Sequence, residues 1–196
     1  MIRLLPVVEG DGDLVAVPEL IRRVLHDKSR FDVNVCRPHK RGDLPKVLSR
    51  FDDFYRTALL EGAAILWVID YDCENCNDTV RDLRLLKKKA AAVDANAAVE
   101  FVFMVQEYES LFLTDHETTR KVFTDIPPDF AFPVDPESVR DAKGWLSKAR
   151  PKGSAYKPTQ HQQRLTAQLD LNRLRSRSPS FQSFESALCR LIKTRE

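Results

Sequence analysis

Four short apolar stretches along the chain have the length and composition of β-strands, and we expect them at residues 2–8, 32–36, 63–69 and 99–105. Between and after them, apolar residues recur every three or four positions, which is the spacing of amphipathic helices. These helices are expected at residues 13–27, 44–60, 79–93, 136–149, 159–174 and 180–192. Strands that alternate with helices at this interval predict an α/β fold with a parallel sheet and right-handed crossovers.

The third stretch, Ala63–Ile69, is apolar throughout and contains β-branched and aromatic residues, which predicts a strand covered on both faces. It runs into Asp70-Tyr-Asp72. Ligands of open parallel sheets bind beyond the carboxyl ends of the strands. Side chains two positions apart share one side of an extended chain, so Asp70 and Asp72 could bind one cation. The alternative is that they only begin a turn, where Asp is common.

The first strand ends in a turn, Glu9-Gly-Asp-Gly-Asp13, that leads into the first helix. A glycine-rich turn between a strand and a helix usually binds phosphate with its backbone amides. Three carboxylates in five positions would repel a bare phosphate, and a divalent cation resolves this conflict. Asp13 could instead be an ordinary acid of a first helical turn. The fourth strand delivers two further acids, Glu107 and Glu109, to the same expected edge.

Three strand ends therefore supply carboxylates and no histidine cluster, a donor set that favours Mg²⁺ or Mn²⁺ over zinc. Two such ions about 4 Å apart can activate a water and stabilise the leaving oxygen of a phosphodiester. The pair Cys73-x-x-Cys76 beside these acids cannot by itself close a tetrahedral zinc site. A redox role for the pair is an alternative with little support, because that motif normally opens a helix after a first strand.

Composition places the chain among globular proteins, with 196 residues, 43% hydrophobic and 31% charged. No apolar stretch approaches the length that crosses a membrane, and the first residues do not resemble a secretory signal. Four cysteines without the spacing of a disulfide scaffold suit a reducing compartment. We therefore expect a cytoplasmic protein.

The net charge of +2 conceals an uneven distribution. Residues 151–196 carry nine basic and three acidic residues, whereas residues 1–150 carry 22 basic and 26 acidic ones. No acid lies between Asp170 and Glu185 to cancel the charge locally, so a polyanion is a natural partner. The candidate nucleic-acid-binding residues of this part are Lys152, His161, Arg173, Arg175 and Arg177. The competing hypothesis is that these arginines bind acidic patches of their own domain or of a protein partner.

A proline-rich connector divides the chain. Its prolines are Pro127, Pro128, Pro133 and Pro136. We predict a catalytic core at residues 1–123. Residues 124–196 form the connector and a basic helical part that packs on the core.

The order of these motifs resembles the Toprim domain of topoisomerases, primases and recombination proteins. Glu9-Gly at the end of the first strand and Asp70-x-Asp72 at the end of the third carry the resemblance. The further acids resemble those of its overcoming-lysogenization-defect (OLD) nuclease branch. Tyr156-Lys-Pro and Ser178-Pro-Ser-Phe181 are similar to a bacterial Toprim-like family of unknown function, often encoded beside ABC-type ATPases.

The resemblance covers nearly the whole chain and implies a parallel sheet of four strands with the first and third adjacent. It also implies roles for individual residues. Glu9 would be a general acid–base or ligand, Asp13, Asp70, Asp72 and Glu109 would be ligands, and Lys157 would be the transition-state cation. Glu107 competes with Glu109, although Glu109 with the following Ser-Leu-Phe-Leu-Thr-Asp115 matches the pattern better.

The acids and the resemblance together predict a Mg²⁺- or Mn²⁺-dependent nuclease, for which DNA is favoured over the alternative substrate RNA. The resemblance further implies a phage-defence system with an ATPase partner. One alternative is a haloacid-dehalogenase-like phosphatase, in which Asp70 and Asp72 would be nucleophile and acid. Those enzymes place the pair on their first strand and usually follow it with Thr, whereas this chain has Glu74. A second alternative is a non-catalytic module that binds nucleic acid or an ATPase.

Overall fold

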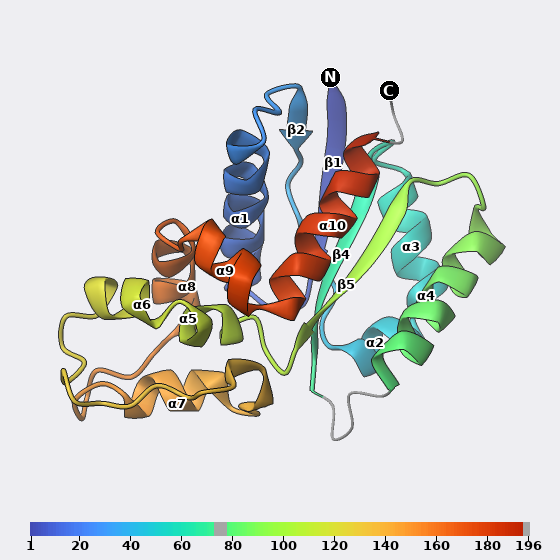
Figure 1. Cartoon of the computed structure of the whole chain (residues 1–196). Coiled ribbons are helices and arrows are strands. Elements are labelled where there is room, and N and C mark those ends of the chain that lie inside the picture. The colour runs from blue at the N-terminus through green and yellow to red at the C-terminus, as the bar shows by residue number, and fades with distance from the viewer. Residues whose placement is uncertain (73–77, 194–196) are drawn as a thin grey trace.

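The computed structural model describes residues 1–72 and 78–193, which form a parallel sheet between two layers of helices (Figure 1). Its strands are β1 (Ile2–Val8), β2 (Val33–Val35), β3 (His39–Lys40), β4 (Ala64–Tyr71) and β5 (Val99–Val105). The order is β2-β1-β4-β5, and β3 pairs with the far end of β1. The α/β fold and the adjacency of the first and third predicted strands are confirmed. The two-residue strand β3, which lies between the second predicted strand and the second predicted helix, makes five strands where four were predicted.

The helices follow the predicted segments, with breaks that the periodicity did not indicate. They are α1 (Asp13–Asp27), α2 (Leu44–Ser49), α3 (Phe51–Leu59), α4 (Thr79–Val93), α5 (Ser110–Thr114), α6 (His116–Val122), α7 (Ala142–Lys148), α8 (Pro158–Thr166), α9 (Leu171–Arg177) and α10 (Pro179–Lys193). The predictions for α1 and α4 are confirmed in both bounds.

Three predicted helices differ from the structure for local reasons. The segment 44–60 breaks at Arg50, whose φ of −123° is not helical. The segment 159–174 breaks because Asp170 accepts hydrogen bonds from the backbone of Asn172 and Arg173 and so begins α9. The segment 136–149 holds only a 3₁₀ turn before Asp141 caps α7. Helices α5 and α6 were not predicted, because five and seven residues are too few to show a clear period.

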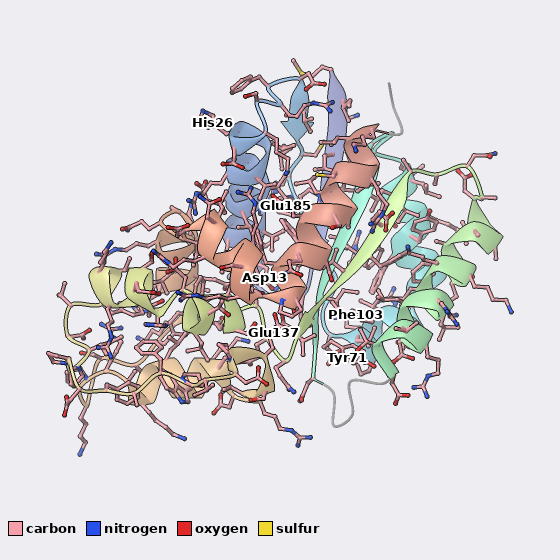
Figure 2. All side chains as sticks on the ribbon, viewed as in Figure 1. Asp13, His26, Tyr71, Phe103, Glu137 and Glu185 are labelled. Carbon is pink, nitrogen blue, oxygen red and sulfur yellow. The ribbon has the colours of Figure 1, made fainter. Side chains whose placement is uncertain are left out.

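Strand β4 is covered on both faces, as its apolar run predicts. Its alternate residues Ile65, Trp67 and Ile69 lie in an apolar cluster with α2, α3 and α4. Leu66 and Val68 lie in a second cluster with α1 and α10 on the other face. Tyr71, the last residue of the strand, stacks on Phe103 of β5 at a centroid distance of 4.4 Å (Figure 2).

The C-terminal helices complete the layer on the α1 side of the sheet. Helix α10 lies across β4 and β5 in Figure 1, and its residues Phe184 and Leu188 belong to the same apolar cluster as the sheet and α1. Helices α5 to α8 gather beyond the carboxyl end of the sheet, next to α1 and α9 (Figure 1). Within the described ranges, no helix combines the length and the apolar character that a membrane span requires.

The basic helix α9 makes ion pairs inside the domain. Arg173 donates to the fully buried Asp115 over 2.6 Å, and Asp115 also accepts the backbone N–H of Asp170. Arg175 contacts Asp27 and Glu185. Arg177 lies 3.2 Å from Glu117 at the surface.

The fold therefore pairs these three charges, although no acid lies between Asp170 and Glu185 in the sequence. Their acidic partners lie on α1 and α10 and in the segment before and within α6. Most of these partners are far away in sequence, so a local charge count could not find them. The ion pairs favour the competing hypothesis that the arginines bind acidic groups of their own domain, and DNA binding by this helix remains a prediction.

We predict that Arg173→Gln lowers the free energy of unfolding by about 3 kcal/mol, because it leaves the buried Asp115 carboxylate without its charged partner. Arg177→Gln should cost less than about 0.5 kcal/mol, because its pair with Glu117 is exposed. Urea denaturation of both variants checks the difference. Equal effects would show that Asp115 does not depend on Arg173.

Candidate functional site

Parallel pairing brings two of the predicted acids to one edge of the sheet. In the register of β1 and β4, Val8 lies opposite Val68. Glu9 therefore follows β1 at the level where β4 reaches Ile69 and Asp70. Strand β5 lies on the other side of β4, with Met104 opposite Asp70, so its acids arrive at the same edge. The adjacency of β1 and β4 is thus what places Glu9 beside Asp70.

Asp13 is held at the start of α1 by hydrogen bonds to both of its carboxylate oxygens. The backbone N–H of Gly10 donates to Oδ2 over 2.8 Å, and the buried amide of Gln162 on α8 donates to Oδ1 over 2.6 Å. Gly12 allows this approach of α8, because a Cβ there would lie 1.9 Å from the Gln162 side-chain oxygen. Asp13 lies at the lower end of α1 in the view of Figure 2.

The chain turns sharply after β5, and this turn separates Glu107 from Glu109. Gln106 has a φ of +65°, a left-handed conformation that few residues other than glycine adopt. After it, Glu107 accepts the backbone N–H of Lys143 at the start of α7 over 3.0 Å. Glu109 is fully buried and accepts the hydroxyl of Tyr156 over 3.1 Å. The two glutamates therefore have different surroundings.

One ammonium group lies among these acids. Lys143 Nζ is 2.8 Å from Glu107 Oε1, 3.1 Å from Glu109 Oε2 and 3.6 Å from Asp70 Oδ2. Its side chain is 37% exposed, so one side of the group faces solvent. Asp70 is otherwise held by the backbone N–H of Tyr108, which donates to Oδ1 over 2.9 Å. Lys143 thus contacts acids from two strand ends at once.

A single lysine does not neutralise this group of acids. Burial, reinforced by the charge of Asp13, raises the pKa of Glu9 to about 7. Burial also raises the pKa of Glu109 to about 7, although Lys143 opposes the shift. The pKa of Asp70 lies well above its ordinary value because of burial and the nearby Asp13, and burial raises the pKa of Asp13 as well. The site is therefore short of positive charge.

Two clefts meet at this group and share Glu9, Asp70 and Lys143 in their linings. The larger, of about 760 Å³, opens toward α2 and α4 and is also lined by the exposed Asp72. The smaller, of about 310 Å³, lies on the α1 and α8 side and reaches Asp13 and Glu109. All six acids predicted as metal ligands therefore line one cleft or the other.

The donor set fits a hard divalent cation, since every candidate ligand is a carboxylate. The oxygen Glu109 Oε2 is consistent with a cation ligand. Within the described residues it is buried without a hydrogen-bond partner, and it lies 3.1 Å from Lys143 Nζ. In the part of the chain that the structure describes, no three His, Cys, Asp or Glu side chains are gathered closely enough to hold a metal ion as they stand.

The predicted basic residues lie outside this group. Lys157 is exposed at the residue before α8, where its backbone N–H donates to His161, and Lys152 is exposed in the preceding loop. Burial and the nearby Arg150 lower the pKa of His161. The structure thus places Lys143, and not the predicted Lys157, among the acids. Cys73 and Cys76 lie outside the described residues.

Sequence reasoning missed Lys143, Tyr156 as a partner of Glu109, and Gln162. Lys143 stood in a predicted helix, directly after the inward Ala142 and three residues before the inward Leu146. The position of this lysine at the border of an apolar helix face was the one sequence feature that could have indicated its place in the site. Gln162 gave none, because its role depends on the packing of α8 against the Gly12 backbone.

We predict that Glu109→Gln changes how the stability of the metal-free protein depends on pH. The folded-state pKa of Glu109, about 7, exceeds the ordinary 4.5, so the folded state binds this proton more tightly than the unfolded state. Wild-type stability contributed by this group is present below pH 4.5 and is lost as pH rises toward 7, by on the order of 3 kcal/mol. In denaturation experiments with EDTA, the free energy of unfolding of the variant should rise relative to that of wild type between pH 5 and 8. A stability difference that stays constant with pH would contradict this prediction.

Comparison with solved structures finds the C-terminal region of the OLD protein of Xanthomonas campestris pv. campestris. The structure phased with iodine has a TM-score of 0.43 at 12% identity and covers 100% of this chain and 99% of that chain. The structure phased with mercury has a TM-score of 0.39 at 14% identity and covers 96% and 97%. The structure phased with platinum has a TM-score of 0.40 at 12% identity and covers 100% and 98%.

No curated protein matches the sequence. A family described as "Domain of unknown function (DUF4276)" matches residues 8–189, which include every acid of the site and Lys143. Because this match spans nearly the whole chain, the protein belongs to the DUF4276 family.

Proposed function

We propose that this protein is a nuclease that hydrolyses phosphodiester bonds with the help of Mg²⁺ or Mn²⁺. One observation carries the proposal: acids from three strand ends line two clefts that share one lysine, and four of these acids have raised pKa values. Buried carboxylates that repel one another form a site that a divalent cation would stabilise. Structural ion-pair networks normally balance their charges, and this one does not.

The acids that would hold the cation divide between the two clefts. Glu9, Asp70 and Asp72 line the open cleft, and Asp13 and Glu109 line the smaller one. A bound divalent ion would supply a water of lowered pKa and a positive charge for the leaving oxygen. Asp13 keeps its orientation through Gly10 and Gln162, so it contributes a pre-positioned carboxylate.

Glu9 is suited to move a proton at neutral pH. A general acid–base works best when its pKa lies near the working pH, and burial brings the pKa of Glu9 to about 7. Its carboxylate lines both clefts, so it faces the space where a substrate would enter. Glu9 would accept a proton from the attacking water and return it to the leaving oxygen.

Lys143 is suited to the role of the cation that stabilises the transition state. Burial lowers its pKa, but Glu109, Asp70 and Glu107 outweigh that effect and raise it, so the side chain stays charged. Its ammonium faces both clefts. When a divalent cation binds the carboxylates, the Lys143 ammonium would leave their oxygens and contact the oxygens of a phosphate instead.

The sequence motifs support nucleic acid as the substrate. Glu9-Gly and Asp70-x-Asp72 resemble the Toprim pattern, and the pairing of β1 with β4 places them side by side. From the same resemblance we take DNA as the substrate, the cytoplasm as the location, and defence with an ABC-type ATPase partner as the setting. The ion pairs of Arg173, Arg175 and Arg177 add no support for DNA binding.

The decisive experiment replaces Asp70 and Asp72 together with Asn. We expect cleavage of supercoiled plasmid, assayed with Mg²⁺ or Mn²⁺, to fall to the EDTA background, because two cation ligands are neutralised. The melting temperature without metal should hold or rise, since mutual repulsion is relieved. Mn²⁺ at 100 times its Kd should stabilise wild type by about 2.7 kcal/mol and leave the double variant unchanged.

Asp78→Asn is the matched control, because Asp78 lines the same cleft but pairs with Arg81 in the first turn of α4. It should keep both cleavage and the Mn²⁺ effect. Full cleavage by the double variant would contradict the assignment. A Mn²⁺ effect without cleavage of plasmid, RNA or a phosphomonoester would point to the non-catalytic binding module.

A second test separates Lys143 from Lys157. We expect Lys143→Gln to reduce cleavage at least about 100-fold, as loss of a group that stabilises transition-state charge does. The same variant should bind Mn²⁺ at least as tightly as wild type in a calorimetric titration, since a competing cation has gone. Lys157→Gln, an exposed lysine, should cleave like wild type. The reverse order of effects would restore Lys157 to the role that the resemblance implies.

A further inference from the structure

Strand β5 forms an open edge of the sheet. The hydrogen bonds from Ile65 N to Ala98 O and from Gln106 N to Tyr71 O show that the even-numbered residues of this strand pair with β4. The odd-numbered residues direct their backbone groups outward, and Val105 N–H accordingly reaches Ser180 Oγ on α10. No described residue makes a hydrogen bond to the outward N–H and C=O groups of Phe101 and Phe103. These four groups are unpaired within the described residues, but both phenylalanines are only 3% exposed, so an added strand would have to enter between the flanking helices to reach them.

A groove of about 560 Å³ runs along this edge, and the backbone of β5 forms its floor. Helices α4 and α10 stand on either side of β5, as Figure 1 shows. The α4 wall contributes the apolar Leu83 and the 57% exposed Val80, together with the basic Arg84 and Lys87. The α10 wall presents the small exposed residues Ser183 and Ser186, which leave room beside the strand.

The charged residues that line this groove are all basic, namely Arg84, Lys87 and Arg190. Glu100, a buried acid of β5, accepts from Arg190 over 2.6 Å and lies 3.2 Å from Lys87, so an ion bridge crosses the strand edge at its beginning. Arg84 projects from the middle of α4 and is exposed. The groove therefore combines unpaired backbone groups, apolar side chains of α4 and a positive rim.

We propose that this groove binds an extended, acidic segment of a partner protein, which adds to β5 as a further strand. Backbone pairing with an open sheet edge gives affinity, and side-chain pockets give selectivity. Alternate side chains of the added strand would face Val80 and Leu83 on one side and the serines of α10 on the other. Acidic side chains at the rim would meet Arg84. The inference does not depend on the nuclease proposal.

Other occupants fit the groove less well. A second copy of this chain would bring the same two flanking helices and the same basic rim, so both shape and charge oppose edge-to-edge pairing. Nucleic acid would match the positive rim but would leave the outward backbone groups of Phe101 and Phe103 and the apolar side chains of α4 without complementary partners.

The test selects binders from a displayed library of random decapeptides against the wild-type protein. We expect enrichment of extended sequences that carry apolar and acidic residues on the same side of the strand, the side that faces Val80, Leu83 and Arg84 of α4. A synthetic peptide of the enriched sequence should bind at least tenfold more weakly to Ser183→Trp, which fills the groove from an exposed position, and to Arg84→Glu, which reverses the rim charge. Ser176→Trp, an exposed serine of α9 outside the groove, is the matched control and should bind like wild type.

Amide hydrogen exchange at Phe101 and Phe103 gives an independent measurement. Both amides should exchange at least tenfold more slowly with the peptide bound, because their N–H groups become paired. The proposal is overturned if no sequence is enriched, or if binding is equal in wild type and both groove variants. It is also overturned if the groove variants instead abolish a dimer of this chain or the binding of an oligonucleotide.

Discussion

Carboxylates gathered at one edge of a sheet repel one another, and in this structure the positive charge of Lys143 partly offsets that repulsion. It contacts acids that follow two different strands, Asp70 from β4 and Glu107 and Glu109 from beyond β5. Helix α7 is held in turn by these contacts, because Glu107 accepts the N–H of its second residue. The position of the connector helix and the charge of the site therefore depend on the same interaction.

Elsewhere the molecule balances its buried charges more completely. Asp115 has an arginine and two backbone donors, and Glu100 lies between Lys87 and Arg190. Such networks stabilise both partners in their charged forms. Within the described residues the carboxyl edge differs from these networks, since several acids there lie around one lysine. This contrast between balanced and unbalanced clusters within one chain is the physical reason to regard the edge as a functional site.

The sequence was sufficient for the features that depend on local patterns. The unbroken apolar run of β4 indicated a strand buried on both faces, and the acids at Glu9 and Asp70 reached one edge because parallel pairing requires it. Lys143 could not be found in this way, because the connector between residues 123 and 142 has no regular period that would fix where α7 lies. The ion pairs of the α9 arginines could not be predicted either, because most of their acidic partners lie on elements that are distant in the sequence.

The contacts of Asp13 and Glu109 also set an order of events as the chain emerges. Both acids lie in the first 115 residues, whereas Lys143, Tyr156 and Gln162 follow them. The sheet strands are therefore synthesised before the groups that neutralise and orient their acids. Contacts of such long sequence separation form late, because the intervening loop must first be closed. The carboxyl edge thus reaches its final electrostatic state only when α7, Tyr156 and α8 have docked on it.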